Sequence, residues 1–151
     1  MNNLPRVLLV DESVGDRRLA ALVLRGEFGD LELEAVGTAT EFSAALAAGD
    51  FGLVITEAEL SWAPGLDVVQ LVRQVQPECP VVLFTSASGE SLWAESLRLG
   101  VDGYVSKSSD GFVRLPAAVR SVFFATRRRA AASSRDAPYR RLLDAVPVGV
   151  F

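Results

Sequence analysis

Four of the short apolar runs in this chain end in carboxylate, hydroxyl or ammonium side chains. These residues are Asp11 with Glu12, Glu57, Thr85 and Lys107. Clustered carboxylates bind hard divalent cations such as Mg²⁺, which prefer oxygen ligands. A lysine and a threonine beside such a cation can neutralise and orient phosphoryl oxygens, because phosphoryl transfer depends mainly on positioning and charge stabilisation. If the residues at the ends of these runs lie close together in the fold, they form a site for a divalent cation and a phosphoryl group.

The apolar runs alternate with segments of helical periodicity. Strands are predicted at 6–10, 31–36, 53–55, 81–84 and 102–106, and helices at 14–28, 38–49, 67–76, 89–99 and from Pro116 onward. Ser13 is suited to begin the first helix, and Gly29 and Gly49 are suited to end the first two. This alternation is typical of an α/β fold with a doubly wound, five-stranded parallel sheet. The carboxyl ends of its strands share one edge, so the polar residues should converge there.

The composition excludes several kinds of site. The chain has 151 residues, half of them hydrophobic, which is enough for one domain with a real core. It has no histidine, which excludes Ser-His-Asp and Cys-His nucleophilic sites, His-liganded zinc and a role as a phosphohistidine donor. Its single cysteine, Cys79, excludes an internal disulfide. Without a secretory segment or an apolar run of membrane-spanning length, the predicted location is cytoplasmic.

Charge divides the chain into two parts. Residues 1–110 carry 7 Lys/Arg and 17 Asp/Glu, a net of −10, whereas residues 111–151 carry 8 and 2, a net of +6. The first part is typical of an acidic globular domain, and the second of a basic helix or tail with a different purpose. We predict neither a nucleic-acid partner nor a membrane partner for this chain.

In their order and spacing, the polar residues and Tyr104 resemble the motif set of the receiver domain of two-component response regulators. The resemblance covers roughly residues 4–125. It implies a flavodoxin-like sheet with five helices and an Mg²⁺ site. From the repulsion among the three carboxylates we expect weak Mg²⁺ or Mn²⁺ binding at Glu12 and Glu57 with Asp11 acting through water; in the alternative, Glu57 reaches Lys107, which fills the place of the cation. The resemblance also implies phosphorylation of an aspartate at the position of Glu57, with Thr85 and Lys107 binding the phosphoryl group. Tyr104 matches the switch residue that moves with Thr85, and a sensor histidine kinase is the implied partner.

The chain departs from that family pattern at the phosphoacceptor, where Glu57 replaces aspartate. The extra methylene moves the carboxylate outward by about 1.3 Å along the side chain. A misplacement of about 1 Å at a reacting centre can cost roughly a hundredfold in rate. We therefore predict a pseudo-receiver that is not an enzyme and acts by interaction. Glu57 either mimics the phosphorylated state or pairs with Lys107 and fixes the domain in one state.

Other functions are compatible with parts of the pattern. One alternative is a conventional, phosphorylatable receiver. A phosphohydrolase of the haloacid dehalogenase type also places acids after the first strand, but it needs an aspartate where this chain has Ser13. A Rossmann nucleotide site requires a glycine-rich loop that the segment 11–15 lacks. A flavodoxin-like electron carrier would share the fold class and would be coloured by bound flavin.

Beyond residue 125 the sequence predicts a second region. We expect a receiver-like domain at 1–125, a connector helix and linker at 126–138 with a break at Ser133-Ser134, and a third segment at 139–151. The last segment resembles the opening of a PAS sensory domain, which implies a longer signalling protein whose downstream domains are partners of the receiver.

An interaction face is predicted from exposed aromatic residues. Helical spacing places Ala94, Leu97 and Val101 on the core side of their helix, so that Trp93 points outward. Trp and Tyr are favoured anchors of interfaces. We predict a homodimer through the face made by the fourth helix, the fifth strand and the last helix. Its predicted interface residues are Trp93, Tyr104, Val119 and Phe123.

Overall fold

A five-stranded, fully parallel sheet forms the centre of the computed structural model, which describes residues 5–63, 66–108 and 110–135. The strand order is β2-β1-β3-β4-β5. The strands are β1 (Val7–Val10), β2 (Leu33–Val36), β3 (Leu53–Thr56), β4 (Val81–Thr85) and β5 (Gly103–Ser106). The predicted flavodoxin-like fold class is therefore confirmed, and β1 and β3 lie at the point where the strand order reverses.

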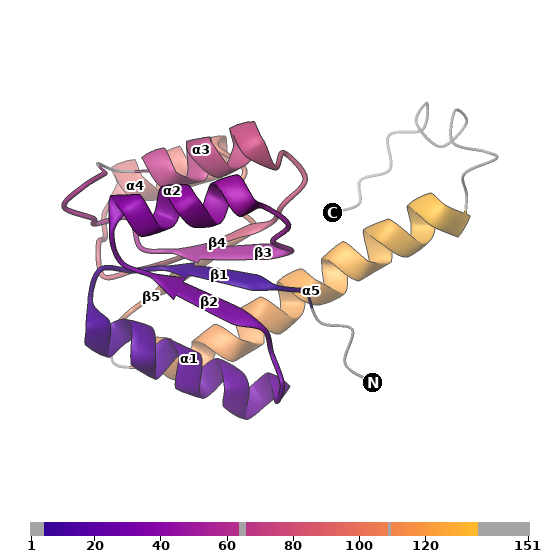
Figure 1. Cartoon of the computed structure of the whole chain (residues 1–151), viewed down its shortest axis with the longest axis horizontal. Coiled ribbons are helices and arrows are strands. Elements are labelled where there is room, and N and C mark those ends of the chain that lie inside the picture. The colour runs from indigo at the N-terminus through magenta and orange to yellow at the C-terminus, as the bar shows by residue number, and fades with distance from the viewer. Residues whose placement is uncertain (1–4, 64–65, 109, 136–151) are drawn as a thin grey trace.

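Five helices cover the two faces of the sheet (Figure 1). They are α1 (Val14–Phe28), α2 (Ala39–Ala48), α3 (Asp67–Val75), α4 (Glu90–Arg98) and α5 (Gly111–Arg135). The side chains of α1 and α5 share one core cluster, and those of α2 and α3 share the other, against which α4 packs. No helix in the described part of the chain is long and apolar enough to cross a bilayer.

The central strands are apolar on both sides because each side packs against helices. Along β1, Leu8 and Val10 contribute to the core on the α2–α3 side, while Val7 and Leu9 contribute to the core on the α1–α5 side. The same alternation continues through β3 and β4, whose residues are all buried. This double coverage explains why the runs are continuously hydrophobic. It also leaves the strand ends as the place for polar groups.

The ends of α1 and α2 lie where the capping residues predicted them. Ser13 accepts a hydrogen bond from the Asp16 amide and caps α1. Thr38 and Glu41 form a reciprocal capping box at the start of α2. Gly29 and Gly49 end the two helices with φ angles of 70° and 73°, a conformation that favours glycine.

The last helix departs from its prediction at both ends. It begins at Gly111 rather than near Pro116, which lies inside the helix. Glycine is required at this start because a Cβ there would collide with the carbonyl oxygen of Ser106. The helix continues past the predicted break at Ser133-Ser134 to Arg135, since the alanines and arginines before them favour helix. Its C-terminal part projects beyond the sheet (Figure 1). The segment 139–151, which is predicted to open a PAS-like domain, lies outside the described residues.

The predicted core side of α4 is wrong for Ala94 and Leu97, whereas Val101, just after the helix, packs against the core as predicted. Ala94 is exposed and Leu97 is 59% exposed, whereas Ser96 is buried. The Ser96 hydroxyl donates to the carbonyl of Trp93 at 2.8 Å, which satisfies it inside the core. The side of α4 that faces the core is therefore about half a turn away from the predicted side. The prediction missed it because apolar spacing alone does not reveal a buried polar side chain that bonds to its own helix.

Two of the four predicted interface residues also have a different place. Val119 and Phe123 are buried in the core between α5 and the sheet. The Phe123 ring packs edge-on against the Phe28 ring, with centroids 5.4 Å apart. They therefore stabilise the domain and do not present a surface. Trp93 is 49% exposed, as predicted, and stacks edge-on against Tyr104 with ring centroids 5.2 Å apart.

Candidate functional site

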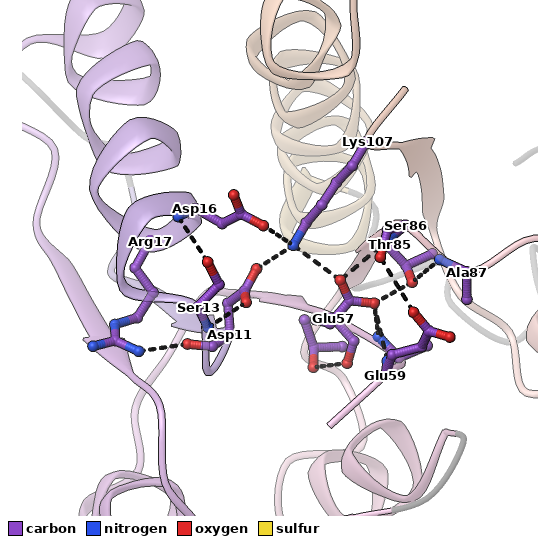
Figure 2. Close-up of polar contacts among 12 residues, drawn as sticks. Asp11, Ser13, Asp16, Arg17, Glu57, Glu59, Thr85, Ser86, Ala87 and Lys107 are labelled. Atoms are coloured by element: carbon purple, nitrogen blue, oxygen red, sulfur yellow. Dashed lines mark hydrogen bonds and ion pairs between the residues drawn. The ribbon is translucent and has the colours of Figure 1, made fainter. Parts of the chain in front are cut away.

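The carboxyl ends of four strands bring their polar residues to one edge of the sheet (Figure 2). Asp11 follows β1, Glu57 follows β3, Thr85 ends β4 and Lys107 follows β5. The parallel register fixes these positions, since Val10 pairs with Thr56 and Thr85 pairs with Ser106. Four of the five polar residues that the sequence singles out thus lie in one connected cluster.

Lys107 is the centre of this cluster. Its ammonium nitrogen lies 2.5 Å from Asp11 Oδ2, 2.8 Å from Asp16 Oδ2 and 2.9 Å from Glu57 Oε1. The side chains of Lys107, Asp11 and Glu57 are only 5–6% exposed, and that of Asp16 is 38% exposed. The three ammonium hydrogens therefore meet three carboxylates in a largely water-excluded site.

Glu57 has protein donors on both carboxylate oxygens. Oε2 accepts the amides of Ala58 and Glu59 at 2.8 and 2.9 Å and the hydroxyl of Thr85. Oε1 faces Lys107 and accepts a longer bond of 3.4 Å from the Ser86 amide. Both carboxylate oxygens of Glu57 are thus engaged by protein donors.

Glu12 does not join the other two carboxylates. It is exposed, and its Oε1 accepts a 2.5 Å hydrogen bond from the Ser61 amide in the loop after β3. The described residues contain no group of three His, Cys, Asp or Glu side chains arranged to hold a metal ion. In this arrangement the predicted Mg²⁺ ligands do not fit a divalent cation, because Lys107 lies between Asp11 and Glu57.

The pKa values of the cluster follow from burial and hydrogen bonding. Burial alone would lower the pKa of Lys107, but hydrogen bonds from its ammonium to Asp11, Asp16 and Glu57 outweigh burial and raise it. Burial likewise favours a higher pKa for Glu57, but bonds from Thr85, the Glu59 amide and Lys107 leave that pKa lowered. The pKa of Asp11 is raised, because burial outweighs its bonds with Lys107 and the Ser13 amide. Glu57 and Lys107 are therefore a charged pair at neutral pH.

A chain of hydrogen bonds connects Glu57 to Tyr104. The hydroxyl of Thr85 donates to Glu57 and accepts the Ala87 amide at 2.9 Å. The Tyr104 hydroxyl donates to the Ala87 carbonyl at 3.4 Å. The two predicted switch residues, Thr85 and Tyr104, thus contact the same loop residue, and Glu57 reaches that loop through Thr85.

Residues that the sequence did not single out complete the site. Asp16, in the first turn of α1, is a direct partner of Lys107. The Arg17 guanidinium donates to the Asp11 carbonyl at 2.7 Å and supports the turn between β1 and α1. Glu59 accepts the Ser86 hydroxyl at 3.2 Å beside Glu57. An acidic residue in the first turn of the helix after β1 is the sequence signal that could have identified Asp16.

A comparison with protein families shows which family has this fold and sequence. The model of the response regulator receiver domain matches residues 7–120. The chain belongs to this family. It therefore carries a receiver domain of the type found in two-component signalling proteins, and the phosphohydrolase, Rossmann and electron-carrier alternatives lose their support.

Individual relatives agree with the family. The chain is 29% identical over 110 residues to a protein-glutamate methylesterase/protein-glutamine glutaminase from Trichodesmium erythraeum (strain IMS101), covering 70% of this chain and 30% of that protein. A CheY-like response regulator receiver domain protein from Methanospirillum hungatei JF-1 aligns with a TM-score of 0.75 at 21% identity, covering 84% of this chain and 99% of that one. The Mn²⁺-bound form of response regulator Rcp1 aligns with a TM-score of 0.68 at 25% identity, covering 76% and 91%. The chain spans about 30% of the length of the curated relatives that it matches.

Proposed function

We propose that this domain is a pseudo-receiver: a signalling module that acts by interaction, without turnover and without phosphorylation at Glu57. In this proposal Glu57, which follows β3, takes the position of the phosphoaccepting aspartate. The observation that supports the proposal is the bonding of its carboxylate, which meets Lys107 on one oxygen and Thr85 and two backbone amides on the other.

The contacts of Glu57 favour a domain held in one signalling state. Lys107 and Thr85 are the two groups suited to orient phosphoryl oxygens, and both already bind the glutamate. A phosphoaspartate carries about −2 charge where glutamate carries −1, so the imitation is partial in charge. The Glu57 side chain, which is longer than that of aspartate, nevertheless bonds directly to Thr85, and Thr85 in turn bonds to the loop that Tyr104 contacts.

The partners follow from the faces that this state presents. We propose that the domain forms a homodimer through α4, β5 and α5, centred on the exposed Trp93 and its neighbour Tyr104. β5 is an edge strand of the sheet, where contact with a second chain is easiest. In this proposal α5 connects the receiver at 1–125, through 126–138, to a PAS-like domain that begins at 139–151. In this proposal a sensor histidine kinase binds the domain but transfers no phosphoryl group to Glu57.

Phosphorylation of Glu57 is tested by intact-mass measurement after incubation with phosphoramidate and Mg²⁺. The wild type is expected to gain no phosphoryl group, because the carboxylate is misplaced and already bonded. Glu57→Asp, which shortens the side chain, is expected to gain one.

Two variants serve as controls for this measurement. Glu59→Asp makes the same change at an exposed neighbouring acid and should gain no phosphoryl group. Glu57→Gln removes the candidate acceptor. A phosphoryl adduct on the wild type that Glu57→Gln abolishes would overturn the proposed function.

A further inference from the structure

The environment of Lys107 is unusually complete for a lysine. Three carboxylates surround the ammonium group, and its nitrogen lies 5.5 Å from the centroid of the Phe84 ring, whose face also attracts a cation. Lys107 is also the only lysine in the chain, which uses arginine at every other basic position. An ammonium group is a compact charge with three donors, whereas a guanidinium is a planar fork. The three carboxylates of this site suit the compact ammonium group of lysine.

Asp16 supplies the contact from the solvent side of the cluster. Asp11 and Glu57 are buried beneath the ammonium, while the half-exposed Asp16 reaches it from the first turn of α1 (Figure 2). The backbone of Asp16 is fixed, since its amide donates to the Ser13 hydroxyl. Asp16 thereby closes the direction in which the lysine side chain could leave toward water.

We propose that Lys107 is the resident cation of this site and that Asp16 is the positioning residue that holds it there, so that a divalent cation does not enter while the lysine is in place. This inference rests on the proposed function, because a domain that is not phosphorylated has no need of a metal ion for phosphoryl transfer. It goes beyond that function by assigning a role to Asp16 and by making the site independent of metal.

The geometry explains how lysine excludes the metal. Mg²⁺ demands a near-octahedral set of oxygen ligands at short distance. Two of the oxygens nearest the site centre, Asp11 Oδ2 and Glu57 Oε1, are bonded to the ammonium. A metal ion would have to displace Lys107 from both, and Glu12 would have to release the Ser61 amide.

The ammonium signal of Lys107 tests the role of Asp16. In protein labelled with ¹⁵N-lysine, a single side-chain signal is possible, so no assignment is needed. We expect the wild type to show this signal at neutral pH, because three charge-assisted hydrogen bonds slow exchange with water. In Asp16→Asn we expect exchange faster by roughly tenfold or more, the factor that corresponds to about 1.4 kcal/mol.

Asp67→Asn is the matched control. Asp67 also lies in the first turn of a helix, α3, and is exposed, so the substitution makes the same change in charge near a helix start. It should leave ammonium exchange at the wild-type rate. An ammonium signal that is absent from the wild type, or equally affected by both substitutions, would overturn the role of Asp16.

A titration of the wild type with Mn²⁺ tests the exclusion of metal. We expect the amide signals of Asp11 and Glu57 to broaden no more than that of Gly52. Gly52 directly precedes β3 and so lies at the amino-terminal ends of the strands, away from the cluster. Selective broadening at Asp11 and Glu57 would overturn the resident-cation proposal. That outcome is distinct from a phosphoryl adduct on Glu57, so the two proposals can fail separately.

Discussion

Replacing Lys107 with methionine tests how much of the domain's stability depends on the buried cation. The substitution keeps most of the side-chain volume but removes the charge. Among the described residues, Asp11 Oδ2 then has no remaining donor, and Glu57 Oε1 keeps only the 3.4 Å contact with the Ser86 amide. Both oxygens are in side chains that are 5% exposed. Removing one partner of such a buried pair costs about 3–5 kcal/mol.

Urea unfolding followed by fluorescence of Trp62 and Trp93 measures this cost. A domain of this kind has roughly 5–15 kcal/mol of unfolding free energy, so Lys107→Met should shift the midpoint strongly without changing the slope. The double variant Lys107→Met/Glu57→Gln should recover part of the loss, because it no longer buries an unpaired glutamate. Arg98→Met, which breaks an exposed pair with Glu95, should change stability by less than about 1 kcal/mol. A Lys107→Met protein within about 1 kcal/mol of the wild type would refute the reasoning.

Two further predictions concern pH and assembly. The pKa of Glu57 is lowered, so its contribution to stability is present above the ordinary value of 4.5 and is lost as the pH falls through the lower folded value. The difference in unfolding free energy between wild type and Glu57→Gln should therefore be constant at neutral pH and shrink in acid; a difference that grows in acid would contradict it. For the dimer, light scattering at high micromolar concentration should show that Trp93→Glu is monomeric and that Leu22→Glu, a matched change at an exposed residue of α1, stays dimeric like the wild type. A monomeric wild type, or a dimer insensitive to Trp93→Glu, would exclude this face.

The fold and the residues of the cluster could be predicted because parallel topology carries strong sequence signals. Runs buried on both sides predict strands, and Asp11, Glu57 and Lys107 come directly after such runs. Their convergence then follows from the shared edge of the sheet. Ser13 and Thr38 located two helix starts for an equally local reason, since their side chains cap the backbone of their own helix.

What the sequence did not reveal depends on side-chain directions. The carboxylates of Asp11, Glu12 and Glu57 suggested a metal site. In the structure the Glu12 side chain points toward the Ser61 amide instead, and Asp16 points toward Lys107. The position of Asp16 in the first turn of α1 could have indicated its role, but residue spacing does not show that Glu12 points away from the cluster. Ser96 was missed as a core residue because its hydroxyl is satisfied by its own helix. The start of α5 was missed because Pro116 is favoured in the first turn of a helix, and here it lies inside one.

The central claim is that Glu57 holds the domain in one state that phosphodonors do not change. The amide ¹H–¹⁵N spectrum of the wild type, recorded before and after addition of Mg²⁺ and phosphoramidate, tests it most directly. The structure predicts unchanged signals for Thr85, Ala87 and Tyr104, which are connected to Glu57 by hydrogen bonds. Displacement of these signals in the wild type, reversed when the phosphodonor is removed, would contradict the claim.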